Sequence, residues 1–329
     1  MELQLVRRLM GRKLAQWTAL LEKTGLHGTP DGEATVLIYD RETLAATGSR
    51  QGNLLKYIAV DPAHQGEDLT ARVLTALRQD AMEAGHRHLF LYTKPQNQQM
   101  FSSLFFYPIA KTDQVLLMEN RQGGIASFLS GCPARQASGK IGAAVMNCNP
   151  FTLGHQYLVE TAASRCDHLY IFVLSEDKSR FSAHTRLELA KKGVADLSNV
   201  IVCPTGKYLI SSATFPTYFI KDKTFAEDIK CDMDIEVFTS RFAKALNITK
   251  RFVGTEPNSP VTNAYNERLK LLLPQHGIKL IEIERKTSAD EPISASRVRK
   301  LITQGNRSEL IPLLPRSTMD YIDKEFFEK

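Results

Sequence analysis

The sequence predicts an α+β domain followed by an α/β domain with a parallel, doubly wound sheet. Its 329 residues are enough for two domains of ordinary size. A stretch over 121–139 is rich in Gly, Ser and Ala and has weak periodicity, as linkers do. Only after this stretch do short apolar segments alternate regularly with helical patterns. We therefore expect one domain over 1–125, a linker over 126–139 and a second domain over 140–329.

Composition places the chain among ordinary globular proteins, with 43% apolar residues, 24% charged residues and a net charge of +6. This balance suits an anionic small ligand, and the absence of a dense Lys/Arg tract argues against nucleic acid. Five scattered cysteines form no CxxC pair, so we expect neither disulfides nor a zinc site, and a cytoplasmic setting. No run approaches the ~20 apolar residues that span a bilayer, and the N-terminus lacks a signal-peptide run, so no membrane partner is expected.

The first domain has the element order of an α+β fold. Leu69, Val73 and Leu77 form one apolar stripe, which indicates a helix over 68–85 that ends at Gly85. The other expected elements are strands over 34–40, 54–60, 88–94 and 114–119 and a short helix over 97–106.

In the second domain the apolar segments are short and nearly continuous, as in strands buried on both faces of a parallel sheet. Ligands of such sheets bind beyond the carboxyl ends of the strands. The expected strands are 141–146, 168–174, 200–204, 235–240, 250–254 and 278–285, with helices from about 154, around 183–197 and over 264–277.

The segment Thr152-Leu153-Gly154-His155 falls on the first strand-to-helix turn of the second domain. Backbone N–H groups and the dipole at a helix N-terminus attract anions. Gly154 would let the backbone approach a phosphate, and His155 would bring an imidazole N–H to the same place. The alternative is a turn glycine beside a surface histidine, and both interpretations stay open on these four residues.

A second candidate segment is "EPISASRVRKLI", residues 291–302, after the last strand. Ser294 is placed to cap a helix whose first turn carries Ser296, Arg297 and Arg299. Their hydroxyl and guanidinium groups suit β- and γ-phosphates. The alternative is an ordinary capped helix with a basic, solvated face.

The two segments, in this order, resemble the TxGH and ISxSxxR motifs of the nucleotidyltransferase superfamily, which implies a Rossmann-like fold and phosphates held between the motifs. The chain is also similar to the citrate lyase ligase family over most of residues 140–300. This resemblance implies an acid-thiol ligase in which ATP and acetate give acetyl-adenylate and pyrophosphate. The acetyl group then passes to the thiol of the phosphoribosyl-dephospho-coenzyme A group on the acyl carrier subunit of citrate lyase, which activates the lyase. The stretches that carry the similarity are 146–160, 211–219, 241–257, 263–286 and 293–299.

The resemblance also implies residue roles. We expect His155 and Thr152 at the ATP phosphates, Arg299 and Ser296 on the leaving pyrophosphate, and Asn149 orienting the first motif. Acetate is already ionised at pH 7 and needs no general base, so alignment and charge neutralisation carry the chemistry. Mg²⁺ is expected with ATP because it bridges phosphate oxygens, while no histidine spacing predicts a metal site on the protein itself.

Other binding positions are expected after the later strands. Gly254 and Glu256 are expected near the ribose or adenine, and Gly154 and Ser294 at the phosphates. Three further positions have two interpretations each. These are Lys178 and Arg180, which reach a phosphate or lie in a solvated loop, and Arg186, which anchors its helix or faces the site. Cys148 beside the first motif is expected to be a buried packing thiol rather than an acyl carrier.

Residues 54–118 resemble the Gcn5-related acetyltransferase fold, in which an Arg/Gln-x-x-Gly-x-Gly/Ala loop holds the pyrophosphate of coenzyme A. The corresponding loop here runs from Gln65 to Thr70 and keeps Gly66. Asp68 and Thr70 stand where that pattern has small residues, and acidic side chains repel a pyrophosphate. Three uses stay open: docking of the carrier subunit, holding of its coenzyme A-like arm, and acetyltransferase activity.

Three other functions compete with the ligase. An adenylyltransferase that makes a coenzyme or its precursor would require neither the first domain nor the insert over 208–230. A nucleotide-sensing protein with an inactive site is disfavoured because both motifs are intact. An acetyltransferase that acts from the first domain is disfavoured by the altered loop.

Overall fold

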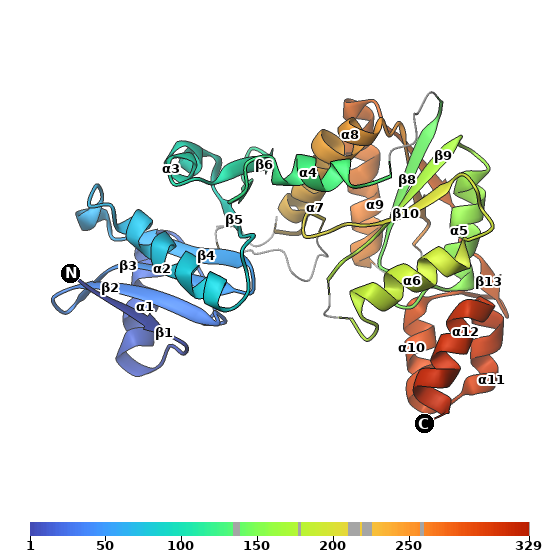
Figure 1. The fold of residues 1–329 in the computed structure, drawn as a ribbon, viewed down its shortest axis with the longest axis horizontal. Helices are drawn as coiled ribbons and strands as arrows, with labels where there is room; N and C mark the ends of the chain where they lie inside the picture. Colours follow the sequence, from blue (N-terminus) through green and yellow to red (C-terminus); the bar gives the residue numbers. More distant parts are fainter. Residues whose placement is uncertain (134–138, 177–178, 210–217, 219–225, 257–259, 329) are drawn as a thin grey trace. The chain divides into compact units, whose positions relative to one another are not determined.

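The computed structural model describes residues 1–133, 139–176, 179–209, 218, 226–256 and 260–328. The chain divides into two compact units (Figure 1). Unit 1 comprises Met1–Gly124 and Phe215–Met233, and unit 2 comprises Ile125–Thr214 and Asp234–Lys329. Among the described helices, none combines the length and the apolar character that a membrane crossing requires.

A seven-stranded sheet forms the centre of unit 1, in the order β1-β2-β3-β4-β5-β7-β6. Neighbouring strands are antiparallel except β4 and β5, which are parallel and are connected through helix α2. The order β4-α2-β5 agrees with the resemblance to the Gcn5-related acetyltransferase fold. The strands are β1 (Glu2–Val6), β2 (Ala34–Asp40), β3 (Thr43–Gln51), β4 (Leu54–Val60), β5 (Phe90–Thr93), β6 (Tyr107–Lys111) and β7 (Leu116–Glu119), and the helices are α1 (Gly11–Lys23), α2 (Leu69–Glu83) and α3 (Gln98–Ser103).

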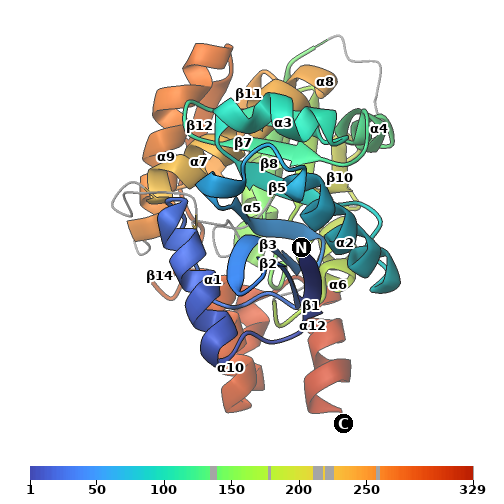
Figure 2. The same ribbon diagram turned by 90° about the vertical axis from the view of Figure 1, so that its left-hand side faces the viewer.

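The two long helices of unit 1 lie on opposite faces of this sheet (Figure 2). Val36 and Ile38 of β2 belong to the same buried cluster as Leu77 of α2. The hydroxyl of Tyr39, the next residue on β2, donates to Gln16 of α1 at 3.2 Å. Because successive strand residues point to opposite faces, this alternation places one helix on each side.

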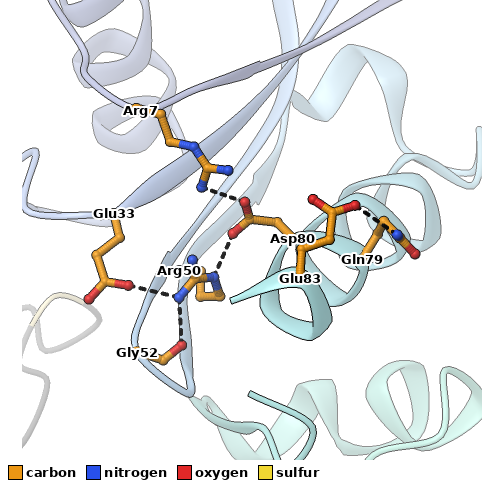
Figure 3. A network of polar contacts seen from close by, with 7 residues as sticks. All are labelled: Arg7, Glu33, Arg50, Gly52, Gln79, Asp80 and Glu83. Atoms are coloured by element: carbon orange, nitrogen blue, oxygen red, sulfur yellow. Dashed lines mark hydrogen bonds and ion pairs between the residues drawn. The ribbon is translucent and has the colours of Figure 1, made fainter. Parts of the chain in front are cut away.

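Buried charges connect α2 to the sheet (Figure 3). Arg50 on β3 and Asp80 on α2 have side chains only 2% exposed, and the Arg50 Nε atom donates to the Asp80 carboxylate at 2.6 Å. The Arg50 Nη1 atom donates to Glu33 and to the carbonyl of Gly52, both at 2.8 Å. Arg7 pairs with the other Asp80 oxygen. Loss of one partner from such a pair would leave an uncompensated buried charge.

A five-stranded parallel sheet forms the centre of unit 2, in the order β10-β9-β8-β11-β12. The chain proceeds from β8 outward to β10 and then crosses back to β11, so the strand order reverses between β8 and β11. Ligands bind at such reversal points in open parallel sheets. The strands are β8 (Ile141–Met146), β9 (His168–Val173), β10 (Val200–Pro204), β11 (Lys250–Gly254) and β12 (Lys279–Ile283), and the helices between them are α5 (Leu153–Ala163), α6 (Ala183–Gly193), α7 (Ala226–Val237), α8 (Lys244–Leu246) and α9 (Pro260–Leu272).

Helical segments cover both faces of the unit 2 sheet. Val159 of α5 and Leu189 of α6 pack in one buried cluster with Ile171 of β9. Phe172, the next residue on β9, contacts the ring of Phe242 with 5.2 Å between the ring centroids. Phe242 belongs to the π-helical segment Phe238–Ala243, so the sheet is doubly wound as predicted.

Three helices at the C-terminus form a separate cluster in unit 2, drawn in red in Figure 1. They are α10 (Ala295–Gln304), α11 (Arg307–Leu310) and α12 (Arg316–Ile322), and the short ladder of β13 (Thr287–Ser288) and β14 (Glu291–Pro292) precedes them. Val298, Leu310 and Ile322 are fully buried in this cluster, which Phe181 joins from the segment after β9. The cluster holds the N-terminus of α10, and therefore the second motif, against the sheet.

The strand predicted over 235–240 is wrong, because these residues are helical. Ile235, Phe238 and Phe242 are all buried, and they follow one another at spacings of three and four residues. This is a helical period, which the β-branched residues of the stretch conceal when it is considered as a short apolar run. The predicted linker over 126–139 includes most of helix α4 (Gly124–Ser130), which buries Ile125 and Leu129.

Unit 1 is discontinuous in sequence, whereas the sequence predicts two contiguous domains. Phe215–Met233 belongs to unit 1 although it follows the first strands of unit 2. Tyr218 lies in this segment, and its hydroxyl donates to the carbonyl of Tyr92 on β5 at 3.1 Å. Its ring packs on Tyr57 of β4 with 4.7 Å between centroids. A single tyrosine thus joins this later segment to two neighbouring strands of the unit 1 sheet.

Candidate functional site

A pocket of about 660 Å³ opens in unit 2 at the carboxyl ends of β8, β11 and β12. It lies where the strand order reverses. Both motifs reach it, together with other residues that the sequence singles out, and Lys178 lies outside the described residues. The predicted residues in its wall are Asn149, Thr152, Gly154, His155, Gly254, Glu256, Ser294, Ser296 and Arg299.

Thr152 and His155 cap helix α5 reciprocally. Thr152 is the N-cap residue, and its hydroxyl accepts a hydrogen bond from the backbone N–H of His155 at 3.3 Å. The Nδ1 atom of His155 accepts from the backbone N–H of Thr152 at 3.0 Å. This is a capping box in which an imidazole takes the place of the usual glutamate. The buried Thr152 therefore fixes the orientation of the imidazole.

The hydrogen bonds of His155 also fix its tautomer. Because Nδ1 accepts from a backbone N–H, the neutral ring carries its proton on Nε2. Burial and, to a smaller extent, the positive charge of Arg285 together lower the pKa of His155 to about 4. The ring also stacks on Phe151 with 5.7 Å between centroids. At neutral pH this side chain is an uncharged N–H donor in a fixed position.

Gly154 is required where the two motifs touch. A Cβ atom at this position would lie 3.1 Å from the carbonyl oxygen of Ile293 and 3.4 Å from its Cβ atom. The first of these distances is tighter than ordinary van der Waals contact, so a side chain would force the segments apart. The structure thus shows a second need for glycine at position 154, besides the predicted approach to phosphate. The missing side chain allows α5 to pack against Ile293, the residue before the cap of α10.

The second motif begins as predicted, with Ser294 as the N-cap of α10. Its hydroxyl accepts from the backbone N–H of Arg297 at 3.2 Å. Arg299 donates to the carbonyl of Asn149 at 2.7 Å and to the hydroxyl of Ser296 at 2.9 Å. Burial lowers the pKa of Arg299, and the nearby charge of Arg180 lowers it further. Arg299 is therefore held in the pocket wall by the loop before the first motif and by its own helix.

Arg180 lies behind Arg299 rather than in the pocket wall. It donates to the carbonyl of Arg299 at 3.3 Å and to the hydroxyl of Thr303 at 2.6 Å. Its guanidinium lies over the ring of Phe326 at 5.0 Å from the centroid. These contacts match neither the predicted phosphate contact nor the predicted solvated loop, because they support α10.

Glu256 and Gly254 are held by residues that the sequence does not single out. Arg285, just after β12, pairs with Glu256 and donates to the carbonyl of Thr255 at 2.7 Å. Asn266 on α9 donates to the carbonyl of Gly254 at 3.0 Å. All of them except Thr255 line the pocket. Arg285 has one sequence signal, its position, since a polar residue just after a parallel strand falls at the ligand-binding edge, whereas Asn266 lies within α9 and has no such signal.

Arg186 anchors its helix and does not line the pocket. Its side chain is fully buried and donates to the carbonyls of Phe181, Asn147 and Glu176. These bonds fix the loops after β8 and β9. Cys148 is also fully buried, and burial raises its pKa to about 12. The thiol is therefore un-ionised, as expected of a packing cysteine rather than an acyl carrier.

Unit 1 contains a pocket of its own, of about 770 Å³, at the loop that resembles a coenzyme A site. Gln65, Gly66, Asp68 and Thr70 line it. Asp68 adopts a left-handed backbone conformation with φ of 54° just before α2, and its side chain forms no cap. The acidic residue predicted to disfavour a pyrophosphate therefore belongs to the wall of this cavity.

The comparisons with known proteins assign the family. The model of the citrate lyase ligase C-terminal domain matches residues 141–322. This chain belongs to the citrate lyase ligase family. The [citrate [pro-3S]-lyase] ligase of Klebsiella pneumoniae is 44% identical over 89% of this chain and 87% of its own length. The protein of the same name from Haemophilus influenzae is 38% identical over 95% of this chain and 96% of its own length.

These relatives confirm the prediction of a ligase that acts on citrate lyase. The adenylyltransferase alternative has weaker support in the family comparison. A phosphopantetheine adenylyltransferase of Streptococcus uberis is 26% identical, over 44% of this chain and 94% of its own length. That match spans less than half of the chain, so it leaves most of the ligase unexplained.

Proposed function

We propose that unit 2 binds ATP with its triphosphate between the N-termini of α5 and α10 and joins acetate to the α-phosphorus. One observation carries this proposal: His155 and Arg299, from motifs far apart in sequence, lie in the wall of one pocket. Two helix N-termini supply N–H groups and positive dipole ends to the same place. A triphosphate is the substrate group that this concentration of donors suits best.

In the first step, a carboxylate oxygen of acetate attacks the α-phosphorus. The bond between the α-phosphorus and the bridging oxygen breaks, and pyrophosphate leaves with the electron pair. His155 donates its Nε2–H to phosphate oxygens as negative charge develops, while Arg299 and Ser296 neutralise the leaving pyrophosphate. Thr152 keeps the imidazole in place, and Asn149 positions Arg299 through its carbonyl oxygen. No residue has to remove a proton, because acetate is already ionised.

In the second step, the thiol of the carrier's prosthetic group attacks the carbonyl carbon of acetyl-adenylate. A thioester forms, AMP leaves with the electron pair of the broken carbon–oxygen bond, and the thiol proton passes to water. The proposed partner is the acyl carrier subunit of citrate lyase with its phosphoribosyl-dephospho-coenzyme A thiol, and the proposed setting is the cytoplasm. Five free cysteines, four of them buried, are compatible with a reducing compartment.

The nucleoside is proposed to lie toward β11 and β12, near Gly254 and Glu256, while Ser294 lies at the phosphates. Mg²⁺ is proposed to enter with ATP, bound mainly by phosphate oxygens and water. Among the described residues, no group of three or more His, Cys, Asp or Glu side chains is placed to hold a metal ion. The protein would therefore hold the ion mainly indirectly, through the phosphates that His155 and Arg299 bind.

The decisive assay is pyrophosphate release from ATP in the presence of acetate and the deacetylated carrier. We expect His155→Ala to reduce turnover by about 100-fold, as the loss of one donor to transition-state charge does. His184→Ala is the matched control, because His184 is exposed on α6 and does not line the pocket. Pyrophosphate release that proceeds equally with phosphopantetheine in place of acetate would instead support an adenylyltransferase.

A further inference from the structure

Arg251 is a buried cation in the wall of the unit 2 pocket. It is the second residue of β11, is 3% exposed and lines the cavity. Its Nε and Nη1 atoms are buried and have no hydrogen-bond partner in the described part of the chain. Buried polar groups of proteins are nearly always hydrogen-bonded, because a donor left without an acceptor costs its full desolvation. Two unmatched donors on one guanidinium at a pocket therefore indicate a ligand acceptor.

The neighbours of Arg251 hold the guanidinium without occupying these donors. Its Cζ atom lies 4.4 Å from the ring centroid of Phe238, a cation–π contact. Asp234 is close enough to act electrostatically on Arg251, but its carboxylate accepts a hydrogen bond from the hydroxyl of Tyr265. Burial lowers the pKa of Arg251, while Tyr265 and Asp234 raise it. The ring of Phe238 and the charge of Asp234 thus hold the cation, while two of its donor nitrogens stay unmatched in the described part of the chain.

The cavity next to Arg251 has an apolar floor. Arg251 and Val253 point to one face of β11, since strand residues two apart share a face. In the parallel register Arg251 lies opposite Ala143 of β8, so Val145 shares this face as well. Val145 and Val253 are half-buried and line the cavity. An apolar surface beside free guanidinium donors is complementary to a short-chain carboxylate, with its methyl group on the valines.

We infer that Arg251 binds the carboxylate of the acid substrate and thereby positions it for attack on the α-phosphorus. The inference rests on the proposed function and assigns the acid-binding residue within it. One carboxylate oxygen accepts from the guanidinium, and the lone pairs of the other oxygen are left for the phosphorus. The acid is a small monocarboxylate, because Val145 and Val253, the pocket residues that share a face of β8 and β11 with the cation, offer room for a short apolar chain.

The test separates the first half-reaction from carrier chemistry. Exchange of labelled pyrophosphate into ATP is measured as a function of acetate and of ATP. We expect Arg251→Gln to raise the KM for acetate by about 10- to 100-fold, the usual effect of losing a hydrogen bond to a charged group. The KM for ATP should change by less than about 3-fold, because the phosphates contact other residues. Arg251→Lys should lie between, since it keeps the charge but not the paired donors.

Two controls distinguish ligand binding from a structural role. Lys250→Gln removes the neighbouring cation on β11, which donates to the carbonyl of Arg165 and does not line the pocket, so the KM for acetate should stay within about 3-fold of wild type. In Arg251→Gly, millimolar guanidinium should lower the raised KM for acetate, which a packing defect would not allow. Where Arg251→Gln fails to fold by circular dichroism, Arg251→Lys provides the same comparison of the two KM values.

Different outcomes test the role of Arg251 and the proposed ligase function. An unchanged KM for acetate in a folded Arg251→Gln protein overturns the inference and leaves the ligase proposal intact. Equal increases in the KM for acetate and for ATP also overturn it, because they indicate a general disturbance of the pocket. Wild-type protein that shows no acetate-dependent exchange at all overturns the proposed function itself.

Discussion

Arg299 donates a hydrogen bond from Nη1 to the backbone carbonyl of Asn149 at 2.7 Å, across 150 positions of sequence. The same guanidinium donates to Ser296 on its own helix. One side chain therefore bridges the loop that precedes the first motif and the helix that carries the second. A planar fork with several fixed donors suits this position, and a flexible ammonium does not.

Replacement of Arg299 tests this bridge. We expect Arg299→Lys to lower kcat/KM for ATP by about 100-fold, because an ammonium keeps the charge but cannot serve Asn149, Ser296 and a phosphate together. Pyrophosphate release over a range of ATP concentrations measures the effect. Arg297→Lys is the matched control on the same helix, since Arg297 pairs with Glu291 at 3.1 Å and lies outside the pocket wall. Comparable losses in the two variants would contradict the assigned role.

Gly154→Ala should reduce activity without reducing stability. Alanine favours a helix over glycine by about 0.5–1 kcal/mol, yet its Cβ atom would press on the carbonyl of Ile293. Separation of the motifs by a few tenths of an ångström should lower kcat/KM for ATP by about 10-fold. Gly254→Ala is the comparison, because its nearest contact would be Leu158 at an ordinary 3.4 Å. Thermal unfolding of both proteins measures their stability. A larger loss of kcat/KM in Gly254→Ala than in Gly154→Ala would contradict the prediction.

The low pKa of His155 predicts how stability depends on pH. That pKa is about 4 in the folded protein, below the value of 6.5 for an unperturbed histidine. Between these values the unfolded chain binds a proton that the folded chain does not, so stability rises with pH across this window and is flat above it. His155→Gln should flatten the rise in melting temperature between about pH 4.5 and pH 7. His184→Gln, on the exposed surface, should keep it, and an unaltered rise in His155→Gln would show that other groups cause it.

The buried pair in unit 1 gives a prediction about stability alone. Asp80→Asn would remove the buried charged partner of the 2% exposed Arg50 and leave it only the more exposed Glu33, at a cost of about 3–5 kcal/mol. Thermal or denaturant unfolding measures the loss. Glu83→Gln on the same helix is the control, because Glu83 is exposed and accepts one bond from Gln79, so its effect should stay within about 0.5 kcal/mol. Equal stability losses in these two variants would mean that the buried charge is tolerated.

Both motifs in the unit 2 pocket can be predicted from sequence because each is local. Thr152 to His155 lies within one helical turn and Ser294 to Arg299 within two, so capping rules place their polar groups directly. The alternation of strands and helices then predicts that both turns lie on one edge of the sheet. This is why nine of the predicted residues lie in one wall.

The rest of the pocket depends on distant pairings that sequence patterns do not reveal. Arg285 acquires its role from Glu256, which lies 29 positions earlier. In the sequence "TKRFVG", Arg251 is indistinguishable from an ordinary charged residue. Only the packing of β11 against Phe238 shows that it is buried. The strand prediction around Ile235 is wrong for a related reason. A short apolar run fits a strand or a buried helix equally well, and tertiary packing decides between them.

The return of Phe215–Met233 to unit 1 has a consequence for anyone who cuts or shuffles this gene. A fragment that stops at residue 124 would expose Tyr57 and leave the Tyr92 carbonyl without the hydroxyl that it receives from Tyr218. No single cleavage site separates the chain into two complete modules. A chimera that exchanges unit 1 between relatives must therefore exchange Phe215–Met233 together with Met1–Gly124.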